Sequence, residues 1–196
     1  MLKTKEESIQ AYKEYTDRHI GFVQKAFDEY GKYLVQKVLA NRYHTESETD
    51  EIVYMKVAQL VQLHDLTKYN KEELEAYAAK FNPYEENIDD ATTIRNNFEK
   101  AWEHHYTHNK HHPEYWLIKM GGKETVIPMS NEAFIEMICD WVAMSMNFKE
   151  STYEWWKNNR EKKAKYFTPL DLEFIDKVMK EFEADFDFSE IKKEEA

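Results

Sequence analysis

An apolar helical run that ends in an adjacent histidine and aspartate constrains the fold of this chain more than any other stretch. Val53, Val57 and Val61 recur at helical spacing, and His64 falls next on the same stripe. The expected helix therefore turns an imidazole toward the core, with the Asp65 carboxylate beside it. A buried charge is costly unless it is paired or bound to a metal, so we expect distant parts of the chain to supply partners.

Helical periodicity extends over the rest of the chain. Only four glycines and four prolines occur in 196 residues, which leaves little turn chemistry, and apolar residues recur at intervals near those of a helix. The sequence therefore predicts an all-α fold, an HD-domain-like helical bundle of about six or seven helices. We expect a single domain over residues 1–188 and a charged tail at 189–196.

The boundaries of the elements are expected from caps and prolines. The predicted helices span residues 8–39, 51–64, 71–81, 90–112 and 132–148, with a short helix from 151 or 152 and a last helix from 169. Residues 115–128 are expected to form a loop or a short β-hairpin over the site.

Composition excludes several classes of function. A net charge of −11 argues against a general nucleic-acid binder, whose footprint would be basic. Cys139 is the only cysteine, which excludes an intrachain disulfide and fits a reducing compartment.

No apolar run approaches the ~18 residues of a membrane span, and the N-terminus lacks the apolar core of a signal peptide. We therefore expect a cytoplasmic protein with no membrane partner, of undetermined oligomeric state.

Metal-competent side chains occur on the apolar faces of three expected helices. They are His19, then His64 with Asp65, then Asp140. Imidazole and carboxylate together suit Mn, Fe, Co or Zn, with Mg less well matched, and ligands from several helices can leave a position open for water or substrate. The pattern predicts one or two divalent metal ions. For each residue alone, a core histidine satisfied by its neighbours, or an aspartate that caps a turn, is the alternative.

A histidine-rich segment, residues 104–112, holds five of the eight histidines. Three of these continue the apolar stripe of the expected helix: His105, His108 and His112. We expect His105 and His112 to be further metal ligands. His111 and Asn109 are candidate substrate contacts, since the helix must end before the following proline and His111 can then turn inward. The alternative is a solvated, pH-responsive surface.

Two cations near the predicted ligands are candidates for contact with an anionic substrate. Lys68 lies three residues after Asp65 and could contact a phosphate or stabilise charge that develops in the transition state. Its alternative is an exposed cation at a helix end. Arg18, beside His19, is a further candidate. We take Asp65 and Lys68 as the candidate catalytic residues.

The order of these ligands resembles the HD-domain superfamily of metal-dependent phosphohydrolases, all-α proteins named for an adjacent His and Asp. On that resemblance His19 matches the first His, His64 and Asp65 match the doublet, and Asp140 matches the final Asp. Lys68 matches the Lys of the HDxxK pattern in the HD-GYP cyclic-dinucleotide phosphodiesterases. The histidine-rich segment looks like the addition that supports a second metal in that branch, although the GYP signature itself is missing.

Two further comparisons limit what the resemblance implies. The nucleotidase branch of the superfamily has Glu where Lys68 stands, so its acid and base assignment does not carry over. The chain also looks similar to an uncharacterised HD-like family of bacteria and their phages, through its NxHHPE segment at residues 109–114. The resemblance spans the chain from about His19 to Trp141.

The resemblance implies hydrolysis of a phosphate ester of a nucleotide or another small phosphorylated molecule, through a metal-activated water. Two alternatives stay open. One is a di-iron HD-type oxygenase, with which a histidine-rich helix is compatible. The other is a non-enzymatic helical binding module that holds a metal for stability.

Overall fold

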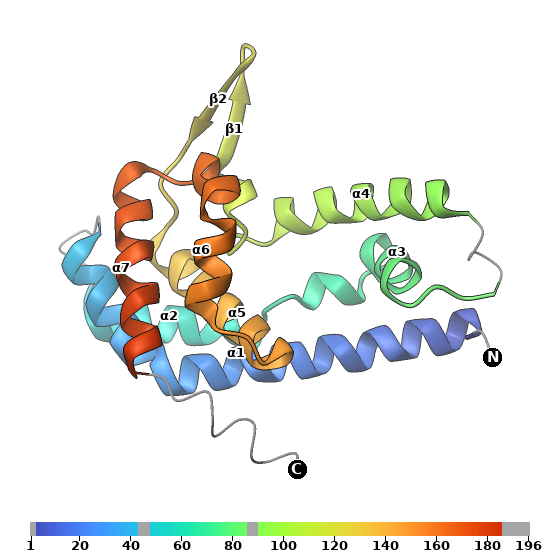
Figure 1. Cartoon of the computed structure of the whole chain (residues 1–196), viewed down its shortest axis with the longest axis horizontal. Helices are drawn as coiled ribbons and strands as arrows, with labels where there is room; N and C mark the ends of the chain where they lie inside the picture. The colour runs from blue at the N-terminus through green and yellow to red at the C-terminus, as the bar shows by residue number, and fades with distance from the viewer. Residues whose placement is uncertain (1–2, 43–47, 86–89, 186–196) are drawn as a thin grey trace.

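The computed structural model of the chain describes residues 3–42, 48–85 and 90–185 (Figure 1). The predicted tail at 189–196 lies outside these residues. Helices dominate the described chain, which confirms the all-α prediction. In chain order the elements are α1 (Lys5–Asn41), α2 (Asp50–Gln62), η1 (Leu66–Tyr69), α3 (Lys71–Phe81), α4 (Ala91–His108), η2 (Pro113–Trp116), β1 (Leu117–Met120), β2 (Lys123–Val126), α5 (Asn131–Phe148), α6 (Thr152–Lys163), η3 (Ala164–Tyr166) and α7 (Pro169–Asp185). In this part of the chain, no helix combines the length and the apolar character needed to cross a membrane.

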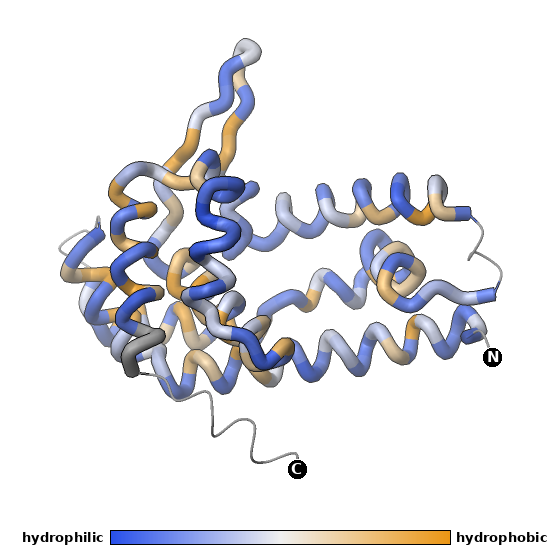
Figure 2. Tube along the Cα trace, viewed as in Figure 1, coloured by the Kyte–Doolittle hydropathy of each residue, from blue (hydrophilic) through white to orange (hydrophobic). Residues whose placement is uncertain are grey.

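The long helix α1 is the base on which α2, α3 and α5 pack (Figure 1). Thr4 and Glu7 form a capping box at its start: the Thr4 hydroxyl accepts from the Glu7 backbone N–H, and the Glu7 carboxylate accepts from the Thr4 N–H. Apolar and hydrophilic stretches alternate along α1, as an amphipathic helix requires (Figure 2). Buried residues recur from Ser8 to Leu39, so the buried face extends along nearly the whole length of α1.

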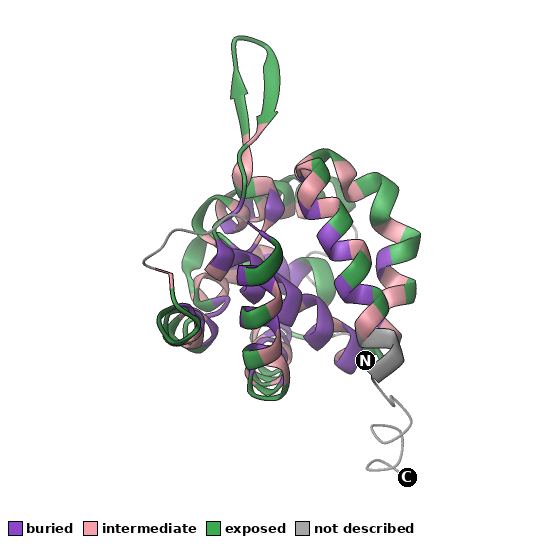
Figure 3. Cartoon of the chain, turned by 90° about the vertical axis from the view of Figure 1, so that its left-hand side faces the viewer, coloured by how far each residue is buried: buried purple, intermediate pink, exposed green. Residues whose placement is uncertain are grey.

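Two apolar clusters share α1. The larger one joins its second half to α2, α5, α6 and α7. The smaller one joins its first half to α3 and α4 around Tyr12 and Tyr77. Buried residues accordingly lie on the inner faces of the helices (Figure 3). His19 lies on α1 between Tyr12 of the small cluster and Val23 of the large one, so the predicted site falls where the two clusters meet.

Helix α4 ends at His108, one turn earlier than the sequence predicted. Asn109 takes an extended conformation, with φ −119° and ψ 105°, and so ends the helix. Its backbone N–H and its side-chain amide both donate to the His105 carbonyl oxygen, at 3.0 Å and 2.8 Å. Residues 109–112 then turn, and Pro113 opens the short helix η2. This early end changes which histidines face inward.

Of the two structures predicted for residues 115–128, the hairpin is present. Strands β1 and β2 pair antiparallel around Gly121 and Gly122, whose φ values of 57° and 78° suit a two-residue hairpin turn. The hairpin projects from the helices rather than covering the site (Figure 1). Most of its residues are exposed, among them Ile118 and Met120, which share one face of β1.

Candidate metal centre

The turn after α2 presents Asp65 to the interior. Val53, Val57 and Val61 are buried along α2, and His64 follows them with 1 % of its surface exposed. The helix ends at Gln62, and Asp65 takes a left-handed conformation with φ 57°. This conformation is uncommon outside glycine, although Asp tolerates it better than most residues. The strained turn points a 2 % exposed carboxylate inward, as is typical of functional sites.

A first group of candidate ligands comes from α1, the end of α2 and α5. It consists of His19, His64 and Asp140, whose ligand atoms lie within 4.8 Å of one another. The Asp140 Oδ1 atom is 3.1 Å from His19 Nε2 and 3.8 Å from His64 Nε2. The Asp65 Oδ2 atom lies 3.6 Å and 3.5 Å from the same two nitrogens. The structure thus brings together all four of the ligands predicted from the HD order.

A second group forms around the other oxygen of Asp65. It consists of Asp65, His105, His111 and His112, again with ligand atoms within 4.8 Å of one another. The Asp65 Oδ1 atom lies 3.2 Å from His105 Nε2 and 3.5 Å from His111 Nε2. His111 and His112 reach this position because α4 ends early and the chain turns back.

Several atoms at the centre of both groups lack hydrogen-bond partners among the described residues. The nitrogen Nε2 is unpaired in His64, His105, His111 and His112, and so is Asp65 Oδ1. The short distances between them do not have the alignment that a hydrogen bond requires. Buried polar atoms are rarely left unpaired, and atoms of this kind are commonly satisfied by a bound water or ion. These buried imidazoles and carboxylates could therefore hold metal ions, with Asp65 shared between the two groups.

The pKa values in the centre favour a charged Asp65 and Asp140. Burial alone would raise the pKa of both carboxyls, but the Lys68 ammonium lowers that of Asp65 and the His19 imidazole lowers that of Asp140. Burial lowers the pKa of His64 and of His112. Ionised carboxylates and neutral imidazoles are the protonation states in which these groups ligate metals.

Lys68 belongs to the same charge network. Its Nζ atom lies 2.5 Å from Asp65 Oδ2. Burial would lower the pKa of Lys68, but the Asp65 carboxylate raises it overall, so the side chain stays a cation. Lys68 also lines a cavity that opens beside the centre and is described below.

Two buried glutamates that the sequence analysis did not single out support the imidazoles. The Glu136 Oε1 atom lies 2.9 Å from His64 Nδ1. The Glu73 Oε2 atom lies 2.8 Å from His105 Nδ1. Since a carboxylate only accepts, these rings donate from Nδ1 and leave Nε2 free for a metal. Glu136 could have been found from the sequence, because it lies one helical turn before Asp140 on the same apolar face.

A cavity of about 650 Å³ opens over the first group. His19, Asp65, Asp140 and His112 contribute to its lining, together with the cations Arg18, Lys68 and Lys163. The rest of the wall is rich in aromatic side chains, among them Tyr15, Tyr77, Trp102, Trp141 and Trp155. A ligand in this cavity would therefore contact the candidate metal ligands, cations and flat apolar surfaces at once.

The structure places the remaining predicted residues as follows. Arg18 lines the cavity, as a substrate contact would. Asn109 instead donates to Thr67 Oγ1 at 2.7 Å and caps α4. His111 lies among the candidate ligands of the second group rather than on the cavity wall. His108, which the helical stripe placed on the inner face, is exposed, so that expectation was wrong. The role of each residue toward a ligand stays a prediction.

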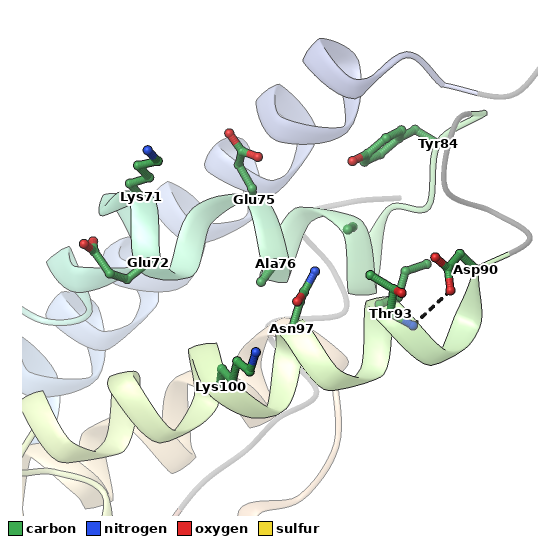
Figure 4. Close-up of a pocket in the computed structure, with 11 residues that line it drawn as sticks. Lys71, Glu72, Glu75, Ala76, Tyr84, Asp90, Thr93, Asn97 and Lys100 are labelled. Carbon is green, nitrogen blue, oxygen red and sulfur yellow. Dashed lines mark hydrogen bonds between the residues drawn. The ribbon is translucent and has the colours of Figure 1, made fainter.

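A second hollow, of about 370 Å³, lies between α3 and α4 (Figure 4). Charged and polar side chains such as Lys71, Glu72 and Lys100 line much of it. None of the candidate metal ligands contributes to this wall. The hollow is therefore separate from the metal centre.

Comparison with protein families places the chain in one family. The model of the family of unknown function DUF5662 matches residues 8–182. The chain belongs to this family. No curated protein and no solved structure matches it. The matched residues include every member of both candidate metal groups.

Proposed function

We propose that this DUF5662 protein is a metal-dependent phosphohydrolase of the HD type, acting on a nucleotide or another small phosphorylated molecule. One observation carries the proposal. The two oxygens of the buried Asp65 face two groups of imidazoles, and His19 and Asp140 of the first group line a cavity. The order His19, His64, Asp65 and Asp140 along the chain adds the resemblance to HD enzymes.

The residues of the centre fit divalent metals. The unpaired Nε2 atoms and Asp65 Oδ1 supply nitrogen and oxygen donors, and no cysteine takes part. Mn, Fe, Co and Zn suit this donor set better than Mg. Bound metals would lower the pKa of water and polarise a phosphoryl oxygen.

The chain's own side chains would bind and orient the substrate. Lys68, held against Asp65, has its ammonium at the boundary between the metal centre and the cavity, where it can contact a phosphoryl oxygen. Arg18 and Lys163 line the same cavity and add positive charge for an anionic ligand, within a chain of net charge −11. The aromatic wall would contact a flat apolar part of the substrate and keep water from it.

The test combines metal analysis with an activity screen. Protein purified without added metal is analysed for its elements, and then assayed against a panel of phosphorylated metabolites with Mn²⁺ or Co²⁺. We expect bound metal and phosphate release, and loss of both in the variant His64→Ala plus Asp65→Ala. A metal-free wild type, or a double variant that keeps its metal and activity, contradicts the proposal.

A di-iron oxygenase is the second candidate. The observation that favours it is the second group, in which three imidazoles surround one oxygen of Asp65, a donor set that also suits iron. Iron as the predominant metal, together with substrate-dependent consumption of O2, would support this candidate. Phosphate release in the absence of O2 would support the hydrolase.

A further inference from the structure

One oxygen of Glu136 contacts both candidate metal groups. Its Oε1 atom lies 2.9 Å from Nδ1 of His64, which belongs to the first group, and 3.3 Å from Nδ1 of His111, which belongs to the second. Glu136 is 4 % exposed, and its ion pairs among the described residues are with these two histidines. A single carboxylate oxygen therefore supports one ligand of each group.

Glu73 offers the contrast. Its Oε2 atom contacts Nδ1 of His105, a ligand of the second group, at 2.8 Å. Its Oε1 atom contacts His104 at 2.7 Å, and His104 belongs to neither group. Glu73 is as buried as Glu136 but supports the second group alone.

We infer that Glu136 is a positioning residue that couples the two metal groups, so that its loss weakens both at once. The inference rests on the proposed metal centre. Because the carboxylate accepts from Nδ1 of His64 and lies 3.3 Å from Nδ1 of His111, it favours a proton on Nδ1 of both rings and directs both Nε2 atoms toward the aspartates. A change at this one oxygen frees His64 and His111 to rotate together.

The position of Glu136 on α5 strengthens this role. It lies one helical turn before Asp140 on the same face, so α5 supplies a first-group ligand and the support for both groups. His64 follows α2 and His111 follows α4, and their ring centroids lie 4.3 Å apart. Within the described chain, Glu136 is the carboxylate that both of their Nδ1 atoms contact.

The experiment measures metal binding apart from turnover. Metal-free wild type, Glu136→Gln and Glu73→Gln are each dialysed to equilibrium against a series of Mn²⁺ concentrations, and bound metal is counted. We expect Glu136→Gln to weaken both sites about tenfold to a hundredfold, the usual loss when such a supporting carboxylate is changed. Glu73→Gln, the matched control, should weaken metal binding at the second group by a similar factor and leave binding at the first group unchanged.

Two further readouts separate positioning from a role in folding. The visible absorption of the Co²⁺-loaded proteins reports ligand geometry, and we expect it to change in Glu136→Gln. If that variant does not fold, Glu136→Asp keeps the charge on a shorter side chain, and we expect it to weaken both sites by a smaller factor. The melting temperature of each metal-free variant shows whether its fold is intact.

The outcomes that overturn the inference are distinct. The inferred coupling is rejected if Glu136→Gln weakens metal binding at one site or at neither. It is also rejected if Glu73→Gln weakens metal binding at both sites. Complete loss of one site with the other intact would make Glu136 itself a ligand, as the proximity of Glu136, His64 and His111 also permits. A wild type that binds no Mn²⁺ overturns this inference and the proposed function together. Metal binding with the expected variant pattern but no hydrolysis leaves the inference standing and rejects the hydrolase.

Discussion

Two polar clusters are buried in this helical protein, and their hydrogen bonding differs completely. One surrounds Arg42, which is 5 % exposed. Its guanidinium donates to Asp171 at 2.9 Å, to Asn131 at 2.8 Å and to the Met129 carbonyl at 3.2 Å, and it lies over the Phe134 ring. The other cluster is the candidate metal centre, in which five imidazole nitrogens and an aspartate oxygen have no hydrogen-bond partner among the described residues.

The difference shows how to tell a structural polar cluster from a binding site. In the Arg42 cluster a planar cation meets acceptors on several sides, and Thr168 binds the second oxygen of Asp171, so the interactions are complete within the chain. In the candidate metal centre, unpaired imidazole nitrogens face carboxylate oxygens, and among the described lysines and arginines Lys68 is the one that pairs with these carboxylates. We propose that a bound cation completes the interactions of the candidate metal centre.

The largest effect should come from breaking the complete cluster. Arg42→Met leaves the buried Asp171 carboxylate without its ion-pair partner, so we expect the free energy of unfolding to fall by about 3–5 kcal/mol. Urea denaturation of the metal-free protein measures this. Arg160→Met, which removes an exposed ion pair with Asp176, is the control and should cost about 1 kcal/mol or less. If Arg42→Met and Arg160→Met lose equal free energies of unfolding, or if Arg42→Met loses metal binding, the two clusters do not differ in the way described.

Metal addition should stabilise the protein through the incomplete cluster. A metal present at about a hundred times its Kd adds about 2.7 kcal/mol to the free energy of unfolding, and a chelator removes it. His105→Ala should lose much of this gain, whereas His108→Ala, an exposed histidine on the same helix, should keep it. The melting temperature with Mn²⁺ and with chelator checks both variants. If His105→Ala keeps the full metal-dependent rise in melting temperature, His105 is not a ligand of the bound metal.

Metal affinity should fall in acid. Burial alone would lower the pKa of His105 and of His111, but the carboxylates of Asp65 and Glu136 raise these pKa values above the ordinary one. Below its raised pKa each imidazole holds a proton that the metal must displace. We therefore expect affinity to drop about tenfold, or about 1.4 kcal/mol, per pH unit for each displaced proton. Mn²⁺ dialysis at a series of pH values measures the slope, and an affinity independent of pH would contradict the proposed ligands.

The smallest effect should come from the cavity cations. Arg18→Gln and Lys163→Gln each remove a positive charge that lines the cavity, and we expect each to weaken binding of inorganic phosphate to the metal-loaded protein by about 1 kcal/mol or less. Titration calorimetry measures this. Lys162→Gln, next to Lys163 but not on the cavity wall, is the control. If all three variants bind phosphate equally, these cations do not contact the anion.

The sequence predicted the helices and the convergence of distant ligands because both follow from periodicity. His19, His64 and Asp140 lie on long apolar stripes, so their inward direction follows from the helix geometry. The resemblance to HD proteins then added the expectation that they share a metal.

The details of the second group did not follow from periodicity. Asn109 leaves the helical conformation and ends α4 early, which turns His111 inward and leaves His108 exposed. Helix ends depend on local backbone conformation and capping, and these are hard to predict from a stripe. Glu73 and Glu136 were missed because an acidic residue in a helix is ordinarily read as exposed.

The most direct test of the central claim is the metal content of protein purified without added metal, compared between wild type and Asp65→Asn. Asparagine keeps the shape and tolerates the left-handed turn, but it removes the charge that both groups share. We expect the wild type to hold metal in both groups and Asp65→Asn to lose the metal from both. A wild type without metal, or a variant that retains the wild-type content, would contradict it.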